Sequence, residues 1–81
     1  MSPKLRRLSA REVLRVLGSL GFEVSATRGS HAKLRRTAPD GSTQVLTLPL
    51  HKELATGTLR AILRQASRFI PADELRPFFF R

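Results

Sequence analysis

The chain has 81 residues, which is enough for one domain, and 15 Lys and Arg against six Asp and Glu give it a formal net charge of +9. That charge favours a polyanionic partner, nucleic acid ahead of a membrane surface, although an acidic protein could also neutralise it. Because cysteine is absent and no apolar run is long enough to cross a bilayer, we exclude disulfides, thiolate metal sites and a membrane span, and we expect a soluble cytoplasmic protein.

The first predicted helix follows a basic arm. Residues 1–8 are expected to be frayed, and their basic stretch is not followed by the apolar segment of a secretory signal. Ser9 and, three residues later, Glu12 form the sequence pattern of a capping box at the start of a helix. Apolar residues then recur at helical spacing as far as Leu20, and Gly21 is expected to end the helix in the left-handed conformation that glycine adopts easily.

Three strands are predicted next, over residues 22–27, 31–36 and 44–48. The first alternates between apolar and polar residues, which predicts that it is half buried. Its apolar residues are Phe22, Val24 and Ala26. Gly29 allows a tight turn between the first two strands, and turn-forming residues at 39–42 connect the second strand to the third.

The alternation in the second strand divides its residues between two faces. Ala32 and Leu34 share the apolar face, which we expect to pack against the core. His31, Lys33 and Arg35 then lie together on the open face.

A second helix with a basic outer face is predicted after the third strand. Thr56 is the expected N-cap, and the helix runs to about residue 68. Arg60, Arg64 and Arg68 recur every four residues and form one stripe on its outer side. Because no acidic residue is interleaved, we expect this stripe to meet a phosphate or carboxylate partner.

Residues 69–81 form a C-terminal extension. Pro71 either ends the second helix or starts a further short one. Three adjacent phenylalanines, Phe78, Phe79 and Phe80, cannot all point inward. The tail therefore either caps the core or offers a contact patch for a partner, and we expect capping with one ring left exposed.

These elements predict an α+β fold of order α-β-β-β-α. Its three-stranded sheet is expected to be antiparallel because the strands are joined by hairpin-length connections. Both helices are expected on one face of the sheet, with a short C-terminal helical extension. We expect a single domain over residues 1–81, made of the basic arm 1–8, the core 9–68 and the extension 69–81.

The stretch Arg28–Lys33 places His31 between cationic side chains at the first turn. Histidine is the side chain whose unperturbed pKa lies nearest neutrality, so it can take up a proton at physiological pH. RNA supplies its own nucleophile, the 2′-OH, and a nuclease that uses it needs a base, an acid and positive charge near the phosphate. We hypothesise that His31 is the base. Lys33, with Arg28 or Arg35, would stabilise the charged phosphorane.

His51 is a second catalytic candidate, because the connector after the third strand could bring it near the sheet edge. The alternative is a histidine that bonds to backbone near Pro49. Ser30 and Lys52 are further candidates for phosphate contact. We expect no metal and no cofactor, because the two histidines and six scattered carboxylates show no ligand spacing.

In four segments the sequence resembles the HicA-type toxins of bacterial and archaeal toxin–antitoxin pairs. The segments are Leu20-Gly21-Phe22, Arg28-Gly29-Ser30-His31, Leu48 to Leu54 and Gly57 to Ala66. The resemblance runs from the first helix through Ala66, and it implies a small ribonuclease with a double-stranded-RNA-binding-like fold. It also implies that His31 is the catalytic residue for cutting mRNA, and that the partner is a HicB-type antitoxin, which binds the toxin and blocks its active site. Two departures from the family pattern are Ala32, where many relatives have a polar or basic residue, and the extension from Phe69 to Arg81.

Two other functions fit the same residues. One is a non-catalytic RNA-binding module of this fold, which would grip A-form minor grooves by shape and by 2′-OH contacts. The other is a protein-interaction subunit, whose arginine stripe and phenylalanine tail would dock an acidic partner. We favour the endoribonuclease toxin, and we expect an antitoxin to cover the His31 face and to contact Arg60, Arg64 or the tail.

Overall fold

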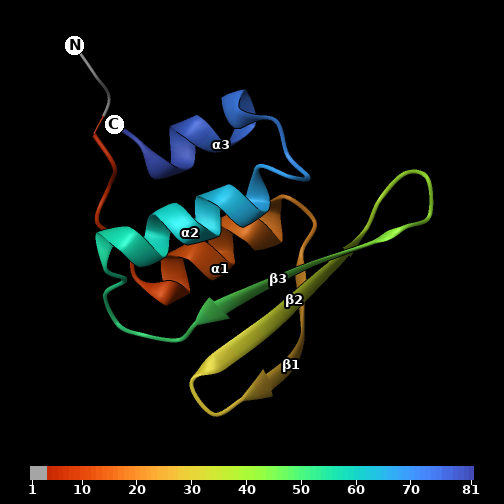
Figure 1. The fold of residues 1–81 in the computed structure, drawn as a ribbon, viewed down its shortest axis with the longest axis horizontal. Helices are drawn as coiled ribbons and strands as arrows, with labels where there is room; N and C mark the ends of the chain where they lie inside the picture. The colour runs from red at the N-terminus through yellow and green to blue at the C-terminus, as the bar shows by residue number, and fades with distance from the viewer. Residues whose placement is uncertain (1–3) are drawn as a thin grey trace.

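A computed structural model describes residues 4–81. The elements in chain order are α1 (Ala10–Ser19), β1 (Glu23–Arg28), β2 (His31–Thr37), β3 (Thr43–Pro49), α2 (Thr56–Ala66) and α3 (Ala72–Phe79). The strands form one antiparallel sheet in the order β1-β2-β3. Helices α1 and α2 cover one face of this sheet, and α3 lies beside α2 on the side away from the sheet (Figure 1). The predicted α+β arrangement is therefore confirmed.

Local signals in the sequence set both ends of α1. The Ser9 hydroxyl accepts a hydrogen bond from the Glu12 backbone N–H at 3.1 Å, and the Glu12 carboxylate accepts one from the Ser9 N–H at 3.0 Å, so the predicted capping box is present. Gly21 follows the helix with a φ of 98°. The Phe22 N–H then reaches back to the Leu17 carbonyl at 3.0 Å, as in a Schellman motif, and turns the chain toward the sheet.

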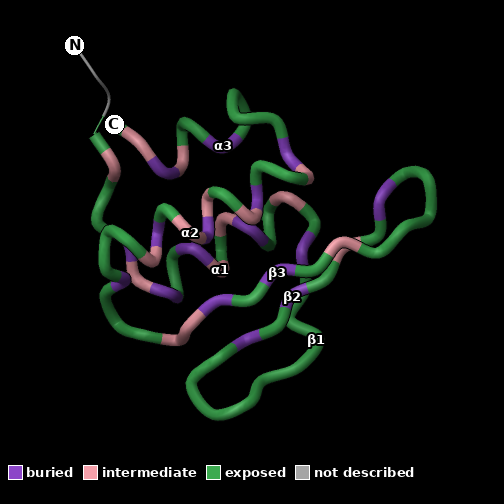
Figure 2. Tube along the Cα trace, viewed as in Figure 1, coloured by how far each residue is buried: buried purple, intermediate pink, exposed green. Residues whose placement is uncertain are grey.

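The hydrophobic core lies between the sheet and the helices (Figure 2). In β2, Ala32 and Leu34 are buried while their neighbours are exposed, as the alternation predicted. In β3, Leu46 and Leu48 are buried in the same way. From the helices the core receives Val13, Leu17, Leu59 and Ile62.

The prediction that the first strand is half buried is wrong. All six residues of β1 are exposed, and Val24 keeps 51% of its surface in contact with solvent. Phe22, which is buried, lies before the strand begins. The reason is tertiary: the helices cover β2 and β3, so β1 is an edge strand beyond that cover, and an irregularity between Val24 and Ala26 interrupts its alternation.

The prediction of a frayed arm is wrong for residues 4–8, and residues 1–3 lie outside the described part of the chain. Lys4 and Arg81 exchange two backbone hydrogen bonds of 3.2 and 3.0 Å, and the Arg6 N–H donates to the Phe79 carbonyl at 2.7 Å. Leu8 is buried in the core. The C-terminal tail thus satisfies the backbone groups of the arm, which no local pattern in the arm itself reveals.

Helix α2 differs from its prediction at both ends. Its N-cap is Ala55, without a side-chain cap, and Thr56 is the first helical residue, so the predicted Thr56 cap is wrong. The helix ends at Ala66. Arg68 therefore lies beyond it, and the basic stripe within the helix consists of Arg60 and Arg64.

The C-terminal extension forms a helix of its own, α3, directly after Pro71. Phe79 is fully buried, and Phe78 and Phe80 are half buried. The tail therefore caps the core as expected, but none of these three rings is left exposed, and that part of the prediction is wrong. No helix among residues 4–81 is long and apolar enough to cross a membrane.

Candidate active site at the first hairpin

A two-residue turn presents His31 at the start of β2. Arg28 and His31 are paired across the hairpin, with Gly29 and Ser30 between them. Gly29 has a φ of 58°, as expected for glycine at the first central position of a tight hairpin turn. The His31 side chain is exposed to solvent. A ligand in solution can therefore reach the imidazole without displacing any part of the core.

The open face of the sheet gathers cationic side chains around this histidine. Residues directly opposite each other in an antiparallel sheet share a face, with Cβ atoms about 5 Å apart. Three cross-strand rows lie on this face: Arg28–His31–Pro49, Ala26–Lys33–Thr47 and Glu23–Arg35–Val45. The structure thus places Arg28, His31, Lys33 and Arg35 on one face of the sheet, and their side chains are exposed.

The rows place these cations at different distances from His31. Arg28 is its direct cross-strand neighbour. Lys33 is two residues along β2, a separation of about 7 Å, and Arg35 is four residues along, about 14 Å. Among the cations of these rows, Arg28 and Lys33 therefore lie nearest to His31, and Arg35 lies farther along the sheet.

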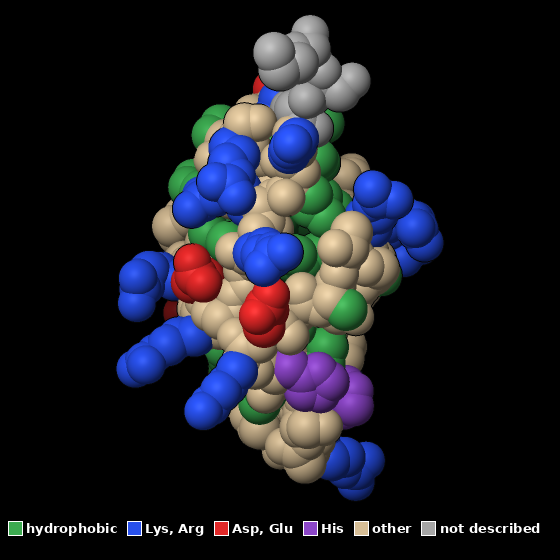
Figure 3. Space-filling view, turned by 90° about the vertical axis from the view of Figure 1, so that its left-hand side faces the viewer, with side chains coloured by type: hydrophobic (Ala, Val, Ile, Leu, Met, Phe, Trp, Pro, Cys, Tyr) green, Lys and Arg blue, Asp and Glu red, His purple; other side chains and the backbone are tan. Residues whose placement is uncertain are grey.

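The connector after β3 brings His51 to the same end of the sheet. The Leu50 N–H donates to the Ser30 carbonyl at 2.6 Å, and the His51 carbonyl accepts from the Ala10 N–H at 3.0 Å. His51 thus lies between the hairpin turn and the start of α1, and its side chain is exposed. Figure 3 shows the histidine side chains (purple) gathered in one patch.

A hollow of about 340 Å³ adjoins this connector. It is lined by Ser9, Ala10, Arg11, Leu14, Leu50, His51 and Lys52. Its sides are apolar where Leu14 and Leu50 contribute, and cationic at Arg11 and Lys52. Arg11 was not predicted as a site residue, because only the tertiary contact between α1 and the connector brings it there.

Ser30 lies in the turn itself, and its side chain is exposed. Its backbone carbonyl is engaged by Leu50. This hydrogen bond ties the hairpin turn to the connector that follows β3.

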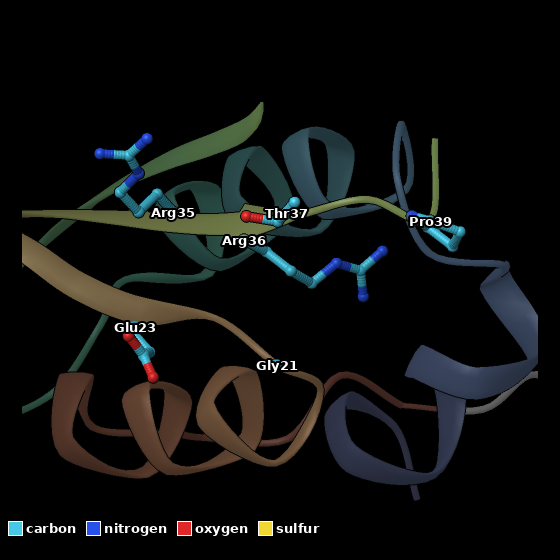
Figure 4. Close-up of a pocket in the computed structure, with 6 residues that line it drawn as sticks. All are labelled: Gly21, Glu23, Arg35, Arg36, Thr37 and Pro39. Atoms are coloured by element: carbon cyan, nitrogen blue, oxygen red, sulfur yellow. The ribbon is translucent and has the colours of Figure 1, made fainter. Parts of the chain in front are cut away.

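A larger hollow, of about 660 Å³, opens at the other end of β2 (Figure 4). It is lined by Gly21, Glu23, Arg35, Arg36, Thr37 and Pro39. Neither histidine lines it, so this hollow is separate from the candidate site at the hairpin.

Arg36, which borders this second hollow, is engaged in holding the fold together. Its guanidinium donates to the Gln44 side chain at 2.8 Å, to the Leu20 carbonyl at 2.9 Å and to the Phe69 carbonyl at 3.3 Å. It also lies over the Phe22 ring, with its central carbon 5.1 Å from the ring centroid. Sequence reasoning did not single it out, although the alternation of β2 places it on the same face as Leu34 and so away from the open face.

The structure does not bring Arg60 and Arg64 to the hairpin. They line a groove between α2 and α3, on the far side of α2 from the sheet. Within residues 4–81, no group of three His, Asp or Glu side chains gathers in a way that could hold a metal ion.

A comparison with known families matches residues 10–67 to the model described as the HicA toxin of bacterial toxin–antitoxin systems. The match includes α1, the whole sheet and α2, and it ends before α3. No curated protein and no solved structure matches the chain.

Proposed function

The chain belongs to the family of HicA toxins of bacterial toxin–antitoxin systems, and from this premise we propose that it is an endoribonuclease that cuts mRNA with His31 as general base. The observation that supports this proposal is the exposed imidazole at the hairpin, directly opposite the Arg28 side chain. An imidazole can accept the proton of a hydroxyl group, and a guanidinium is a permanent positive charge with donors suited to a phosphate.

The proposed reaction uses the RNA as its own nucleophile. His31 takes the proton of a ribose 2′-OH, and the 2′-oxygen attacks the adjacent phosphorus. The bond from phosphorus to the 5′-oxygen breaks, and an acid returns a proton to that leaving oxygen. The products are a 2′,3′-cyclic phosphate and a 5′-OH, and the balance of atoms requires no metal ion and no cofactor.

Positive charge is needed where negative charge develops on the phosphorane. Arg28 and Lys33 are the cations of the sheet nearest to His31, and we assign them this role because donors held in place before the reaction are worth most in it. The Ser30 hydroxyl can donate a further hydrogen bond to the same phosphate. Arg35 would hold the strand farther along the sheet.

His51 is our candidate for the acid, because the connector that holds it adjoins the Ser30 turn. Lys52 and the hollow beside it would receive the nucleotide next to the cleaved bond. The apolar side chains of Leu14 and Leu50 suit the face of an unpaired base, since single-stranded RNA is recognised largely by stacking and packing of exposed bases.

The test compares His31→Ala with His51→Ala on a synthetic single-stranded RNA. Removal of a general base lowers the rate by about 10²–10⁴-fold, and we expect this loss for His31→Ala with RNA affinity nearly unchanged. A comparable rate loss in His51→Ala would support an acid–base pair, and a loss of affinity alone would restrict His51 to binding. If His31→Ala cleaves at the wild-type rate, the proposal is wrong.

The basic open face also favours a second candidate, an RNA-binding module without catalysis. Such a module would bind duplex RNA with a steep dependence on salt concentration. It would leave the RNA intact, and His31→Ala would not change its function. Product analysis therefore separates the two candidates.

A further inference from the structure

The groove between α2 and α3 is a surface that the RNA chemistry does not use. It has a volume of about 250 Å³. We call this surface the α2–α3 groove. It is lined by Arg60, Leu63, Arg64, Ser67, Ala72, Leu75, Arg76 and Phe80. One of its walls comes from α2 and the other from α3 and the tail. The α3 wall lies outside the residues matched to the toxin family, so the groove depends on this chain's own extension.

The groove combines an apolar floor with a basic rim. Among its apolar lining residues, Leu63 and Phe80 are half buried and Leu75 is buried. Arg60, Arg64 and Arg76 are exposed. None of the lining residues is acidic.

The arginines of the rim repel one another. Arg60 and Arg64 are four residues apart on α2, and like charges at that spacing destabilise a helix. Arg76 adds a third positive charge from the opposite wall. A ligand that brings carboxylates would relieve this repulsion while it covers the apolar floor.

We propose that the α2–α3 groove binds an acidic, amphipathic segment of a partner protein. An apolar side chain of that segment would pack on Leu63, Leu75 and Phe80, and flanking carboxylates would pair with the three arginines. The groove combines this apolar floor with three exposed arginines on a different surface from the basic open face of the sheet, which suits an amphipathic protein segment, and RNA binding in the groove is one outcome of the test below. Protein interfaces combine a buried apolar centre with arginine at high frequency.

The groove is separate from the hairpin. It lies between α2 and α3, on the side of α2 away from the sheet (Figure 1). His31, by contrast, belongs to the exposed face of β2, opposite the face that packs against the helices. A segment bound in the groove would therefore anchor a partner without itself covering the imidazole. The identification of this partner as the antitoxin rests on the proposed function. The proposal that the groove binds an acidic segment does not depend on that function.

The experiment uses three probes on the full chain with the His31→Ala substitution, chosen because the proposed function expects it to prevent RNA cleavage, and intact RNA is checked after each measurement. The first is a Glu-rich peptide with two leucines at positions i and i+4, the second is the same peptide with Lys in place of Glu, and the third is a single-stranded RNA. The double substitution Arg60→Glu with Arg64→Glu, called the rim reversal below, reverses the charge of two of the three arginines at the rim. Arg15→Glu with Arg68→Glu is the control, since both residues are exposed and lie outside the groove.

We expect the acidic peptide to bind with a dissociation constant below about 1 mM and the basic peptide not to bind. The rim reversal should weaken acidic-peptide binding by about tenfold or more, because like charges across an interface are strongly unfavourable, and the control should change it less than about threefold. Ala72→Arg provides a further test, since Ala72 is exposed within the groove. It adds positive charge but fills the groove, so we expect weaker binding, whereas attraction by net charge alone would make binding tighter.

Three results would overturn the proposal: no binding of the acidic peptide, an equal loss in the Arg15 and Arg68 control, or a rim reversal that weakens RNA binding instead. If the wild-type chain does not cleave RNA but still binds the acidic peptide through the groove, the proposed nuclease function is wrong and the proposal for the groove stands. The two proposals can therefore fail independently.

Discussion

Arg36 connects parts of the chain that are distant in sequence. Its guanidinium reaches the end of α1 at Leu20, the side chain of Gln44 on β3 and the turn after α2 at Phe69. Because it is partly buried and donates to two backbone carbonyls, its loss leaves acceptors without partners. A charged side chain in this position serves the fold, in contrast to the exposed cations of the open face.

We predict that Arg36→Met lowers the free energy of unfolding by about 2 kcal/mol or more, since each hydrogen bond from a charged group contributes about 1.5–3 kcal/mol. Urea denaturation measures the change. Arg35→Met is the matched control, because Arg35 is the exposed neighbour and surface changes usually cost less than about 0.5 kcal/mol. Equal effects of the two substitutions would contradict the structural role of Arg36.

Position 21 requires glycine because its φ is positive and because the Arg36 side chain lies close to it. Its φ is 98°, and a Cβ at this position would lie 3.1 Å from Cδ of Arg36. We predict that Gly21→Ala destabilises the protein by about 1–2 kcal/mol from backbone strain alone. Gly18→Ala, inside α1, is the control, because nothing lies within 4 Å of the added Cβ, and it should be stabilising by about 1 kcal/mol. Thermal unfolding of both variants checks the opposite signs.

At the scale of elements, α1 is stabilised by its capping box in a way that depends on pH. Hydrogen bonds from the Ser9 backbone and side chain lower the pKa of the Glu12 carboxyl below its ordinary value. A group whose pKa is lower in the folded state stabilises the protein above its unfolded pKa, and this contribution is lost as the pH falls through the folded value. The loss therefore begins near the ordinary value of 4.5 and continues below it.

We predict that Glu12→Gln is less stable than the wild type at neutral pH and that the difference narrows as the pH falls below about 4.5, because the wild-type carboxylate becomes protonated. Urea midpoints of the two proteins, compared from about pH 7 to about pH 3, measure the difference. A difference that stays constant over this range would show that the charge of Glu12 does not contribute to the cap.

The strands show how far alternation can be used. In β2 the pattern predicted correctly that Ala32 and Leu34 face the core and that His31, Lys33 and Arg35 face outward. In β1 an equally clear pattern failed, because burial requires a helix above the strand and none covers this edge. Alternation identifies the two faces of a strand, and only the packing decides whether either is buried.

At the scale of the whole molecule, the two ends of the described chain support each other. The segment 4–6 pairs with the tail from Phe79 to Arg81, and α3 packs on the outer side of α2. Phe79 is fully buried at the centre of this arrangement. The extension is therefore part of the core, and it also forms one wall of the α2–α3 groove.

We predict that Phe79→Ala costs about 3–5 kcal/mol, the usual range for removing a buried phenylalanine. Phe78→Ala is the control, because Phe78 is only half buried and should cost less. Chemical denaturation gives the two values, and amide exchange at Lys4 and Arg6 should accelerate in Phe79→Ala. Protection of these amides unchanged from the wild type would show that the arm is held by other contacts.

Much of the fold follows from neighbours within a few residues. The capping box, the glycine that ends α1, the turn at Gly29 and the two faces of β2 all depend on such short separations, and each is present in the structure. The placement of His31, Lys33 and Arg35 on one face is also local, because alternate residues of a strand point to the same side. Its catalytic role remains a proposal for the His31→Ala experiment.

The rest depended on contacts between distant residues. The pairing of Lys4 with Arg81, the exposure of β1, the engagement of Arg36 and the place of Arg60 and Arg64 in a groove were decided by which surfaces meet in the folded chain. A sequence records which residues are apolar or charged. Which residues each of them contacts depends on the tertiary structure of the whole chain.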